Sequence, residues 1–443
     1  MRAEALAASQ PAWPAPTTIT SYFAAIAIIV PVPKIRALVI GGGGREHAIA
    51  WKLAQSPLIE RVIATPGNPG ITRVAECIQP PNATPEGYLA VAEQIDAGLI
   101  VVGPEAPLVA GTVDLFRAKA PGRKIIGPTA AAAQLEGSKA FSKAFMLRAG
   151  IPTARSVTAA NAAAARVHLD EIGYPAVLKA DGLAAGKGVI IAADRAEALD
   201  ALSKLPAGQI VVEEFLAGEE VSFIVVAEGL RSWPLEATQD HKTIFDGDRG
   251  PNTGGMGAYC DGRILTSSES AEAMRLVIEP ALAQMIAEGT PYTGFLYAGL
   301  MMTPAGIKVL EFNARLGDPE TQVIMHRMES DFAATLLDGA PLTWKRDPSV
   351  CVVMAAYGYP GDVRTGDAIH GLDLAAGAMV FHAGTRRGAG GTVETAGGRV
   401  LGVTASGATL AAAIDSAYAG VRGITIDGAQ YRNDIGAKGL RRW

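Results

Sequence analysis

Short apolar segments alternate with amphipathic segments after Lys34, and this alternation limits the folds open to the chain. The segment IRALVI at 35–40 is typical of a buried strand, and REHAIAWKLAQ at 45–55 places Ile49 and Leu53 one turn apart on a helix face. Strands that alternate with helices predict a parallel, doubly wound sheet. Ligands of such sheets bind beyond the carboxyl ends of the strands. In this chain those ends are the loops GGGGREH at 41–47, TPGNPG at 65–70 and GPEAPL at 103–108.

The composition is that of a globular protein with about two to four domains. The chain has 443 residues, of which 49% are hydrophobic and 19% charged, and its formal net charge is −5. It has no Lys/Arg stripe, so we expect no nucleic-acid partner. The apolar run YFAAIAIIV at 22–30 is too short to span a bilayer, so we expect no membrane partner. We expect residues 1–34 to be a disordered or non-native extension, with a secretory signal as the weaker alternative.

The first glycine-rich loop does not match a dinucleotide-binding site. The pattern G-x-G-x-x-G fails in every register, because Arg45, Glu46 and His47 occupy its later positions. No acidic residue ends the second strand, where the partner of a ribose hydroxyl would lie. NAD is therefore disfavoured, whereas a phosphate at the N-terminus of the following helix stays open.

A second glycine-rich stretch, LKADGLAAGKGV at 178–189, has the composition of a phosphate-holding loop. It is not a P-loop, because Gly182 and Gly186 are one residue too close and Gly188 stands where a Ser or Thr is needed. Apolar segments on both sides predict two strands, so we expect a flap-like hairpin with no helix behind it. An ordinary glycine-rich hairpin is the alternative.

Candidate contacts for ATP and a metal ion surround this flap. Glu311 and Asn313 in VLEFN share one face if this segment is a strand, and their oxygens suit Mg²⁺. Lys139 and Lys179 are candidate phosphate contacts. For each of these groups the alternative is an exposed, solvated side chain. Carboxylates that bracket FLAG are candidates for adenine or ribose contacts, with a charged turn as the alternative; they are Glu213, Glu214, Glu219 and Glu220.

Three local patterns predict secondary structure around these groups. The segment IVVEEFLAGEEVSFIVV at 210–226 predicts two strands around a turn, and YAGLMMTPAGIKVLEFN at 297–313 predicts a hairpin. A helix is expected over 268–288, and Pro280 should bend or split it.

Two further loops have the composition of anion-binding sites. Arg315 in RLGDPE offers a two-pronged donor, and the glycines of GPNTGGMGA at 250–258 should expose backbone N–H groups. The chain has no G-x-S-x-G and no His pair at metal spacing, while His47 and His241 in candidate loops stay open. A flap, a metal site and anion-binding loops without a nucleophile favour phosphoryl transfer from ATP to a carboxylate, followed by attack of an amine.

Several stretches together match one known family. They include GGGGREHA, PGNPG, VGPEAPLV, KADGLAAGKGV, VEEFLAGEEVSF, QDHK, GPNTGGMGAY, EFNARLGDPETQ, VFHAGT and GGRVLGVTA. These stretches run in the family's order from about residue 35 to the C-terminus. In them the chain resembles the glycinamide ribonucleotide synthetases of the ATP-grasp superfamily.

The resemblance implies an α/β fold, α+β in part: an ATP-grasp fold with an N-terminal doubly wound parallel-sheet domain, a small flap domain and a strand-rich C-terminal domain. It implies a cytoplasmic ligase that joins glycine to 5-phosphoribosylamine through glycyl phosphate, with ATP and Mg²⁺ or Mn²⁺, in purine biosynthesis. Its partners would be small-molecule substrates, and the protein would be a monomer or weak homodimer. The implied boundaries are 1–34 for the extension, 35–136 for the N-terminal domain, 137–345 for the ATP-grasp domain with its flap at about 152–222, and 346–443 for the C-terminal domain.

Matched motif by motif, the resemblance also implies the site residues. ATP would be held by Lys139, Lys179, Gly182, Gly186, Lys187, Gly188, the hinge Glu213, Glu214, Phe215 and Leu216, and the ribose contacts Glu219 and Glu220. The metal would be held by Glu311 and Asn313. The substrates would be bound by Gly43, Gly44, Asn68, Glu105, Asp240, Asn252, Thr253, Gly254, Gly255, Met256 and Gly257. The catalytic residues would be Arg315, Asp318 and Lys242.

Two alternative functions can be distinguished from the implied ligase by sequence motifs. A sister ATP-grasp enzyme that carboxylates or formylates a purine intermediate is disfavoured by QDHK and GPNTGGMGAY. A nonenzymatic nucleotide-binding regulator could lose Glu311 or Arg315, and both are present.

The chain departs from the family pattern at the metal site. The stretch YAGLMM offers no acidic or amide ligand on the strand before VLEFN, so the full set of metal ligands stays open.

Overall fold

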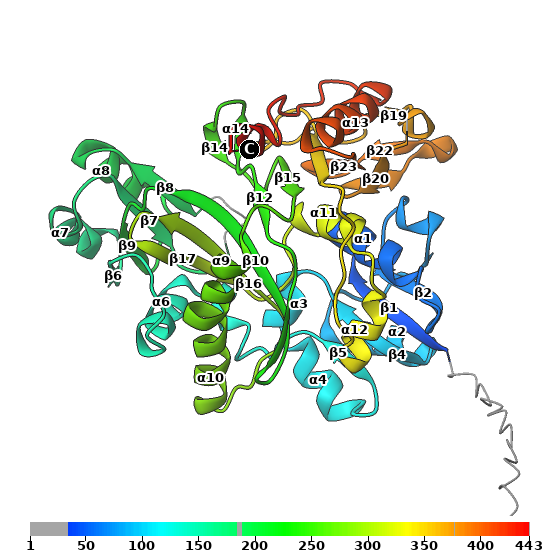
Figure 1. The fold of residues 1–443 in the computed structure, drawn as a ribbon, viewed down its shortest axis with the longest axis horizontal. Helices are drawn as coiled ribbons and strands as arrows, with labels where there is room; N and C mark the ends of the chain where they lie inside the picture. The colour runs from blue at the N-terminus through cyan, green and yellow to red at the C-terminus, as the bar shows by residue number, and fades with distance from the viewer. Residues whose placement is uncertain (1–33, 184–187, 376, 443) are drawn as a thin grey trace, which may run out of the picture. The chain divides into compact units, whose positions relative to one another are not determined.

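The structure, a computed structural model of the chain, describes residues 34–183, 188–375 and 377–442 (Figure 1). The expectations for the extension and for Gly186 and Lys187 lie outside the described residues. Within the described ranges, no helix combines the length and the apolar character needed to cross a membrane.

Five parallel strands form the first sheet, in the order β3-β2-β1-β4-β5. Its central strand β1 is apolar on both faces, and residues 37–40 are fully buried. The predicted doubly wound parallel sheet is confirmed, although the short β3 was not foreseen. The elements are β1 (Ile35–Gly41), α1 (Gly44–Leu53), β2 (Ile59–Pro66), η1 (Ile71–Arg73), β3 (Glu76–Cys77), α2 (Pro85–Gln94), β4 (Ala97–Val102), α3 (Glu105–Val109), α4 (Thr112–Lys119) and β5 (Lys124–Ile126).

A second sheet carries the flap, with four antiparallel strands in the order β6-β9-β7-β8. Strands β7 and β8 pair from Ala176 opposite Ala192 to Lys179 opposite Val189, so the hairpin predicted around the glycine-rich stretch is confirmed. Helices α7 and α8 pack against each other beside this sheet (Figure 1). The elements are β6 (Ser156–Ala159), α7 (Ala162–Ile172), β7 (Ala176–Ala180), β8 (Val189–Ala192), α8 (Arg195–Lys204) and β9 (Ile210–Glu214).

The third sheet has nine strands and joins the middle of the chain to its C-terminal part. Its order is β17-β16-β10-β12-β15-β18-β23-β20, with β11 beside β10. The predicted β16–β17 hairpin is confirmed. The two strands expected over 210–226 are present, but they lie in different sheets, because residues 215–218 carry the chain from the flap to the large sheet. The strands are β10 (Glu219–Glu228), β11 (Arg231–Pro234), β12 (Thr238–Asp240), β15 (Gly257–Cys260), β16 (Thr293–Thr303), β17 (Gly306–Asn313), β18 (Ser349–Ala355), β20 (Met379–His382) and β23 (Arg399–Ser406).

The helix expected over 268–288 is divided into three segments. A π-helical turn, η2 (Met274–Ile278), separates α9 (Ser267–Ala273) from α10 (Glu279–Ala287). Pro280 lies in the first turn of α10, so the prediction that it bends or splits the helix is confirmed. The remaining elements are α5 (Gln134–Gly137), α6 (Lys139–Arg148), β13 (Thr243–Phe245), β14 (Arg249–Asn252), α11 (Glu320–Arg327), α12 (Phe332–Asp338), β19 (Ile369–His370), η3 (Leu372–Leu374), β21 (Thr385–Arg387), η4 (Ala389–Gly391), β22 (Val393–Thr395), α13 (Leu410–Gly423), β24 (Thr425–Ile426) and α14 (Ala437–Arg442).

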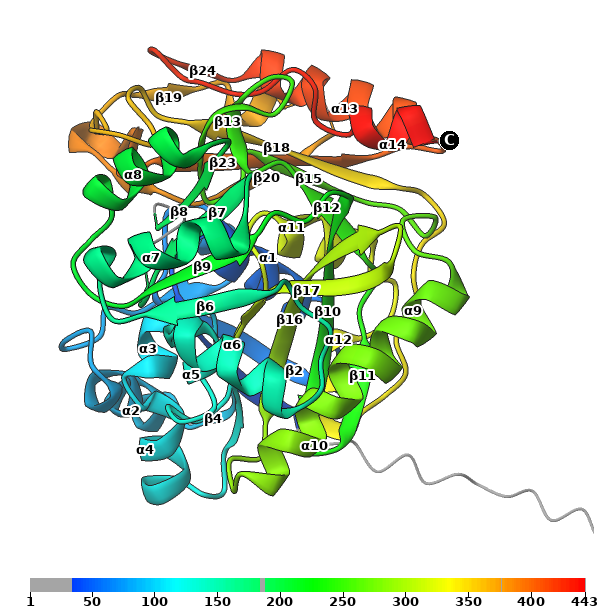
Figure 2. The ribbon, with the colours of Figure 1, turned by 90° about the vertical axis from the view of Figure 1, so that its left-hand side faces the viewer.

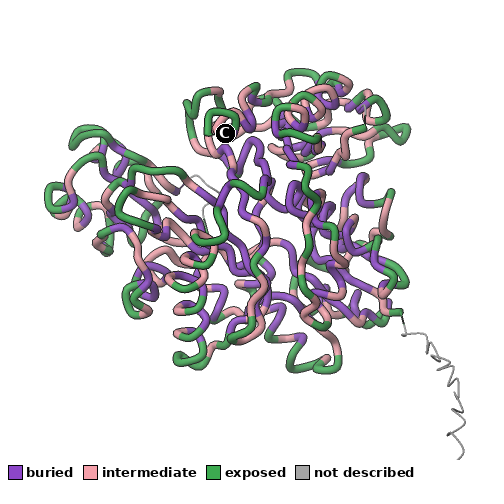
Figure 3. The backbone as a smooth tube through the Cα atoms, in the orientation of Figure 1, coloured by how far each residue is buried: buried purple, intermediate pink, exposed green. Residues whose placement is uncertain are grey.

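The apolar core follows the large sheet. Val277 and Leu282 of the divided helix join Leu296 and Ala298 of β16 in one buried cluster. Figure 2 shows α9 and α10 beside β10 and β16. Buried backbone is concentrated in the strands, whereas the flap helices carry much of the exposed backbone (Figure 3). The large sheet therefore carries the main buried core, and the flap lies beside it.

Helix α1 ties the first sheet to the C-terminal part, because it packs against α11 and β20. His47 of α1 is buried, and its Nδ1 accepts a hydrogen bond of 2.8 Å from the backbone N–H of His382. Its ring meets the edge of Phe381, with the centroids 5.4 Å apart. Burial lowers the pKa of His47 to about 3, and the charges of His382 and Arg73 add to this effect. His47 is thus a neutral packing residue at this joint.

We expect the free energy of unfolding to fall as the pH drops below the ordinary histidine pKa of about 6.5. The unfolded chain protonates His47 there, whereas the folded chain keeps it neutral until the pH approaches about 3, so acid favours unfolding. His47→Asn keeps an acceptor and removes the titration. Between about pH 6 and pH 4 it should reduce the slope of unfolding free energy against pH by about 1.4 kcal/mol per pH unit. Urea unfolding over this range measures the slope, and an unchanged slope would contradict the neutral state of His47.

Candidate active site

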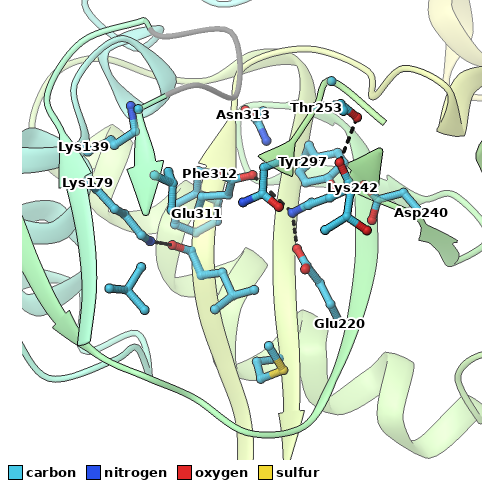
Figure 4. Close-up of a pocket in the computed structure, with 18 of the residues that line it drawn as sticks. Lys139, Lys179, Glu220, Asp240, Lys242, Thr253, Tyr297, Glu311, Phe312 and Asn313 are labelled. Atoms are coloured by element: carbon cyan, nitrogen blue, oxygen red, sulfur yellow. Dashed lines mark hydrogen bonds and ion pairs between the residues drawn. The ribbon is translucent and has the colours of Figure 1, made fainter. Parts of the chain in front are cut away.

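A cavity of about 1100 Å³ lies where the flap sheet, the large sheet and the C-terminal segment meet (Figure 4). The N-terminal domain reaches it through Arg45 in the first turn of α1 and Glu105 at the start of α3. Most of the site residues predicted from the sequence line this cavity, although they come from distant segments. They are Arg315, Asp318, Lys242, Lys139, Lys179, Gly182, Gly188, Glu213, Glu214, Phe215, Leu216, Glu219, Glu220, Glu105, Asp240, Asn252, Thr253, Gly254, Glu311 and Asn313.

One part of the cavity wall is apolar. Val177, Val189 and Ile191 of the flap hairpin contribute to it, together with Leu310 and Phe312 of β17. An apolar wall with a few polar groups at its edge suits the face of a flat aromatic base. The residues predicted as the adenine hinge, 213–216, line the same cavity.

Both carboxylate oxygens of Glu213 are paired with buried lysines. Oε1 lies 3.0 Å from Nζ of Lys143, and Oε2 lies 3.0 Å from Nζ of Lys179. Lys179 also donates a hydrogen bond of 3.0 Å to the carbonyl of Leu310. Burial lowers the pKa of Lys143 although Glu213 opposes this effect. Glu213 therefore fixes Lys179 at the cavity, and both of its carboxylate oxygens are taken up by lysines.

Lys139 lies at the start of α6, next to the base of the flap hairpin. Its Nζ donates a hydrogen bond of 2.7 Å to the carbonyl of Gly182. Asp181 accepts hydrogen bonds from Oγ of Ser138 at 3.0 Å and from the backbone N–H of Ala140 at 3.1 Å. Burial lowers the pKa of Lys139. These contacts join α6 to the flap and place a second lysine beside the cavity.

Lys242 is surrounded by carboxylates (Figure 4). Its Nζ pairs with Glu220 and lies 3.8 Å from Oε1 of Glu311. Burial would lower the pKa of Lys242, but Glu220, Asp240 and Glu311 together raise it well above its ordinary value. Burial raises the pKa of Asp240, although Lys242 opposes this. Lys242 is thus a fixed cation at the centre of the cavity.

Glu311 and Asn313 end β17, and both line the cavity as their spacing predicts (Figure 4). Burial would raise the pKa of Glu311, but Lys242, Lys179 and Arg315 together lower it, so the carboxylate is charged. In the described part of the chain, no group of three or more His, Cys, Asp or Glu is arranged to hold a metal ion. One carboxylate and one amide fit an ion such as Mg²⁺, which takes few protein ligands and keeps water and phosphate oxygens.

Arg315 follows β17 and is held by two glutamates. Its Nη2 donates a hydrogen bond of 2.6 Å to Oε1 of Glu136, and its Nε lies 3.4 Å from Oε2 of Glu105. Burial would lower the pKa of Arg315, but Glu136 and Glu105 raise it above its ordinary value. Arg45, from the first glycine-rich loop, donates 3.0 Å to the carbonyl of Leu316. The first turns of α1 and α3, which follow two strands of the first sheet, therefore meet the segment after β17, as the rule for parallel sheets predicts.

Asp318 lies between the N-terminal and C-terminal loops. Its Oδ2 is 3.4 Å from Nη2 of Arg399, and Arg399 also donates to the carbonyl of Gly254. Burial would raise the pKa of Asp318, but Arg399 leads a group of charges that lower it. A Cβ atom at Gly43 or Gly44 would lie 3.8 Å or 3.6 Å from Asp318. These two glycines therefore flank Asp318 without lining the cavity.

The glycine-rich loop at 250–258 uses two of its N–H groups inside the protein. The N–H of Gly254 donates to the hydroxyl of Tyr359 at 3.0 Å, and that of Gly255 donates to Oγ1 of Thr253 at 3.0 Å. For Gly254 and Gly255 the expectation of N–H groups exposed to an anion is therefore wrong, and for Gly250 and Gly257 it stays a prediction. At Gly255 the lack of a side chain matters instead, because a Cβ there would lie 2.6 Å from Pro319. Gly255, Met256 and Gly257 are absent from the cavity lining.

Asn68 organises the TPGNPG loop and is absent from the cavity lining. Its Nδ2 donates to the carbonyls of Gly42 at 2.9 Å and His382 at 2.8 Å. Its Oδ1 accepts from the backbone N–H groups of Gly70 at 2.9 Å and Ile71 at 3.0 Å. The substrate contact expected for Asn68 stays a prediction.

Several cavity residues had no predicted role, and the clearest are Arg399, Glu320 and Tyr297. Oε1 of Glu320 accepts hydrogen bonds from the hydroxyl of Tyr297 at 3.0 Å and from Oγ of Ser222 at 3.2 Å. Arg399 follows two glycines and starts an apolar strand. This position is the only feature of the local sequence that distinguishes it. Its partners are 145 and 81 residues away in the chain, so no local pattern indicates them.

Glu213→Gln should lower the free energy of unfolding by about 3–5 kcal/mol, because it leaves Lys143 and Lys179 buried without a carboxylate. Glu214→Gln is the matched control. Glu214 is partly exposed and lies 3.2 Å from Nζ of Lys308, so its loss should cost about 1 kcal/mol or less. Urea unfolding of both variants measures the difference, and equal losses would remove the role assigned to Glu213.

Comparison with known families matches nearly all of the chain after residue 34. Residues 35–136 match the N domain described as phosphoribosylglycinamide synthetase, residues 137–321 its ATP-grasp (A) domain, and residues 349–438 its C domain. The phosphoribosylamine–glycine ligases of Ralstonia nicotianae and Escherichia coli are each 50% identical to this chain over 92% of its length, and 100% and 99% of those proteins are covered.

Solved structures agree with these matches. The crystal structure of a phosphoribosylamine–glycine ligase from Thermotoga maritima is 34% identical, with a TM-score of 0.79 over 90% of this chain and 100% of that chain. The biotin carboxylase domain of the Hydrogenobacter thermophilus 2-oxoglutarate carboxylase, at 18% identity and a TM-score of 0.66 over 89% of this chain and 91% of that chain, shares the fold alone. The chain therefore has the ATP-grasp fold and belongs to the phosphoribosylglycinamide synthetase family.

Proposed function

We propose that the protein joins glycine to 5-phosphoribosylamine with cleavage of ATP to ADP and phosphate, giving glycinamide ribonucleotide in purine biosynthesis. The glycine carboxylate takes the terminal phosphoryl group of ATP to form glycyl phosphate, and the amine of phosphoribosylamine then displaces phosphate. The observation that carries this proposal is one cavity that joins Lys139 and Lys179 to the cluster of Arg315, Asp318 and Arg399. Relatives named for this ligation at 50% identity over 92% of the chain support it.

Lys139 and Lys179 neutralise the phosphates of ATP beneath the flap hairpin. Phosphoryl transfer depends chiefly on positioning and on charge neutralisation. The ammonium group of Lys179 is held by Glu213 and by the carbonyl of Leu310, so it needs no reorganisation when the nucleotide binds. The apolar wall holds the adenine, and the carboxylates that start β10 face its ribose.

Glu311 and Asn313 hold the divalent ion, Mg²⁺ or Mn²⁺. The ion, when bound, neutralises negative charge on the phosphates of ATP. Lys242 stands 3.8 Å from Oε1 of Glu311 and helps to keep this carboxylate ionised.

Arg315, Asp318 and Lys242 bind and orient the two substrates. Glu136 and Glu105 fix the planar fork of Arg315, which stabilises negative charge on the transferred phosphoryl group. Asp318 is ionised at neutral pH because Arg399 and neighbouring cations lower its pKa, so it accepts a hydrogen bond from the attacking amine. A cytoplasmic location and a monomeric or weakly dimeric state belong to the same proposal.

The decisive test measures ADP release from ATP and Mg²⁺ with glycine and freshly made phosphoribosylamine supplied together and then omitted in turn. ADP release that needs both, with glycinamide ribonucleotide formed in equal amount, is the expected result. Turnover that ignores glycine would refute the ligase and favour a sister ATP-grasp reaction that carboxylates or formylates a purine intermediate.

Glu311→Gln should lower kcat by roughly 10²–10³-fold and raise the Mg²⁺ concentration needed for half-maximal rate, because one charged metal ligand is lost. Glu228→Gln is the control, since Glu228 is also a glutamate of the large sheet with a lysine, Lys124, beside it but is absent from the cavity lining. Steady-state assays over a Mg²⁺ series measure both effects. A variant at position 311 with the wild-type Mg²⁺ dependence would remove Glu311 from the metal site.

A further inference from the structure

The C-terminal segment returns to the cavity and contacts the hairpin of β13 and β14, which spans 243–252 (Figure 1). Helix α14 contributes Lys438, Arg441 and Arg442 to the cavity wall. Lys438 also lies 2.9 Å from Oδ2 of Asp248 in the hairpin loop. The reaction described above uses none of these side chains, so the contact needs an explanation of its own.

Arg432 is the centre of this contact and is 1% exposed. Its Nη1 donates to the carbonyl of Thr243 at 3.2 Å, to Oγ1 of the same residue at 2.9 Å and to Oδ1 of Asp248 at 3.1 Å. Its Nε and Nη2 donate to the two carboxylate oxygens of Asp434, each at 2.7 Å. One buried guanidinium therefore joins the start and the loop of the hairpin to the C-terminal segment.

Backbone contacts hold the same loop at its tip. Oδ2 of Asp434 accepts a hydrogen bond of 2.8 Å from the backbone N–H of Gly247. The backbone N–H of Asn433 donates 2.8 Å to Oδ1 of Asp246. The C-terminal segment thus contacts each residue of the loop at 246–248, so the hairpin cannot tilt without breaking several hydrogen bonds.

The two ends of the hairpin lie at the cavity. The first strand follows Lys242, and the second ends at Asn252. The backbone N–H and Oγ1 of Thr253 donate to the carbonyl of Lys242 at 2.7 Å and 2.8 Å, which closes the base of the hairpin. Lys242 in turn pairs with Glu220. A change in hairpin orientation therefore moves Lys242 and Thr253 together.

We propose that Arg432 is a positioning residue for the substrate site. It acts through the hairpin, which it holds in the one orientation that places Lys242, Asn252 and Thr253 in the cavity. This inference rests on the proposed function, which assigns Lys242, at the base of the hairpin, to the binding of glycine and phosphoribosylamine.

The geometry requires a guanidinium rather than any cation. Two parallel hydrogen bonds to Asp434 use Nε and Nη2, while Nη1 is directed at Thr243 and Asp248. A planar fork makes both sets of bonds at once, whereas an ammonium group on a flexible stem does not. Arg432→Lys should therefore raise KM for the co-substrates less than Arg432→Met does, but it should not keep the wild-type value.

The test compares Arg432→Met with Arg263→Met in the full chain. Arg263 is the matched control, because it also makes a two-pronged contact with an aspartate two residues away, at 2.9 Å and 2.7 Å to Asp261. It is absent from the cavity lining. Arg432→Met should raise KM for glycine or phosphoribosylamine at least ten-fold and raise KM for ATP by a clearly smaller factor, because Lys242 also pairs with Glu220. Arg263→Met should leave all three values unchanged.

Hydrogen exchange separates positioning from a general loss of structure. In Arg432→Met, exchange should speed up in residues 243–252 and stay unchanged in the first sheet and the flap. Unchanged KM values for both co-substrates, or an equal rise in all three, would overturn the inference. If Arg432→Met does not fold, Asp434→Asn, which loosens the same fork, replaces it under the same criteria. A wild-type protein that fails to consume glycine refutes the proposed function instead, so the two failures are distinct.

Discussion

Buried positive charge is the constraint on which this structure depends. Lys143, Lys179 and Arg432 are buried, Arg315 and Arg399 are half-buried, and an unpaired charge in a fully buried place costs several kcal/mol. Each of them meets a carboxylate from another element or loop. The pairs therefore do more than neutralise charge, because each one sets the position of two segments relative to each other.

This arrangement explains why the cavity is prepared for an anionic ligand. The cost of removing the cations from water is met when the chain folds, and their partners hold them in fixed orientations. Under the proposed function, the phosphate groups of ATP would meet ammonium groups that are already desolvated. Lys179 shows this most clearly, because Glu213 holds it from one side and the carbonyl of Leu310 from the other.

Local patterns in the sequence predicted the parts of the fold that local physics determines. The parallel sheet, the β7–β8 flap hairpin and the alternation of Glu311 and Asn313 follow from apolar periodicity and glycine placement. Three features depend on partners far away in the chain. They are the passage of the chain from the flap sheet to the large sheet after β9, the role of Arg399 and the role of Arg432. Arg432, for example, contacts Thr243 across 189 residues, and no spacing rule connects the two.

The glycines at 254 and 255 have a packing role that their residue pattern did not indicate. Their density indicated a ligand-binding loop because glycine exposes backbone N–H groups, yet both N–H groups bond within the protein. The physical requirement is space: Cβ atoms there would lie 3.0 Å from the guanidinium carbon of Arg399 and 2.6 Å from Pro319. Glycine lets this loop pack directly against the segment that carries Asp318. The same residues therefore serve the site by close approach of two backbones, and any larger side chain would push Arg399 away from Asp318.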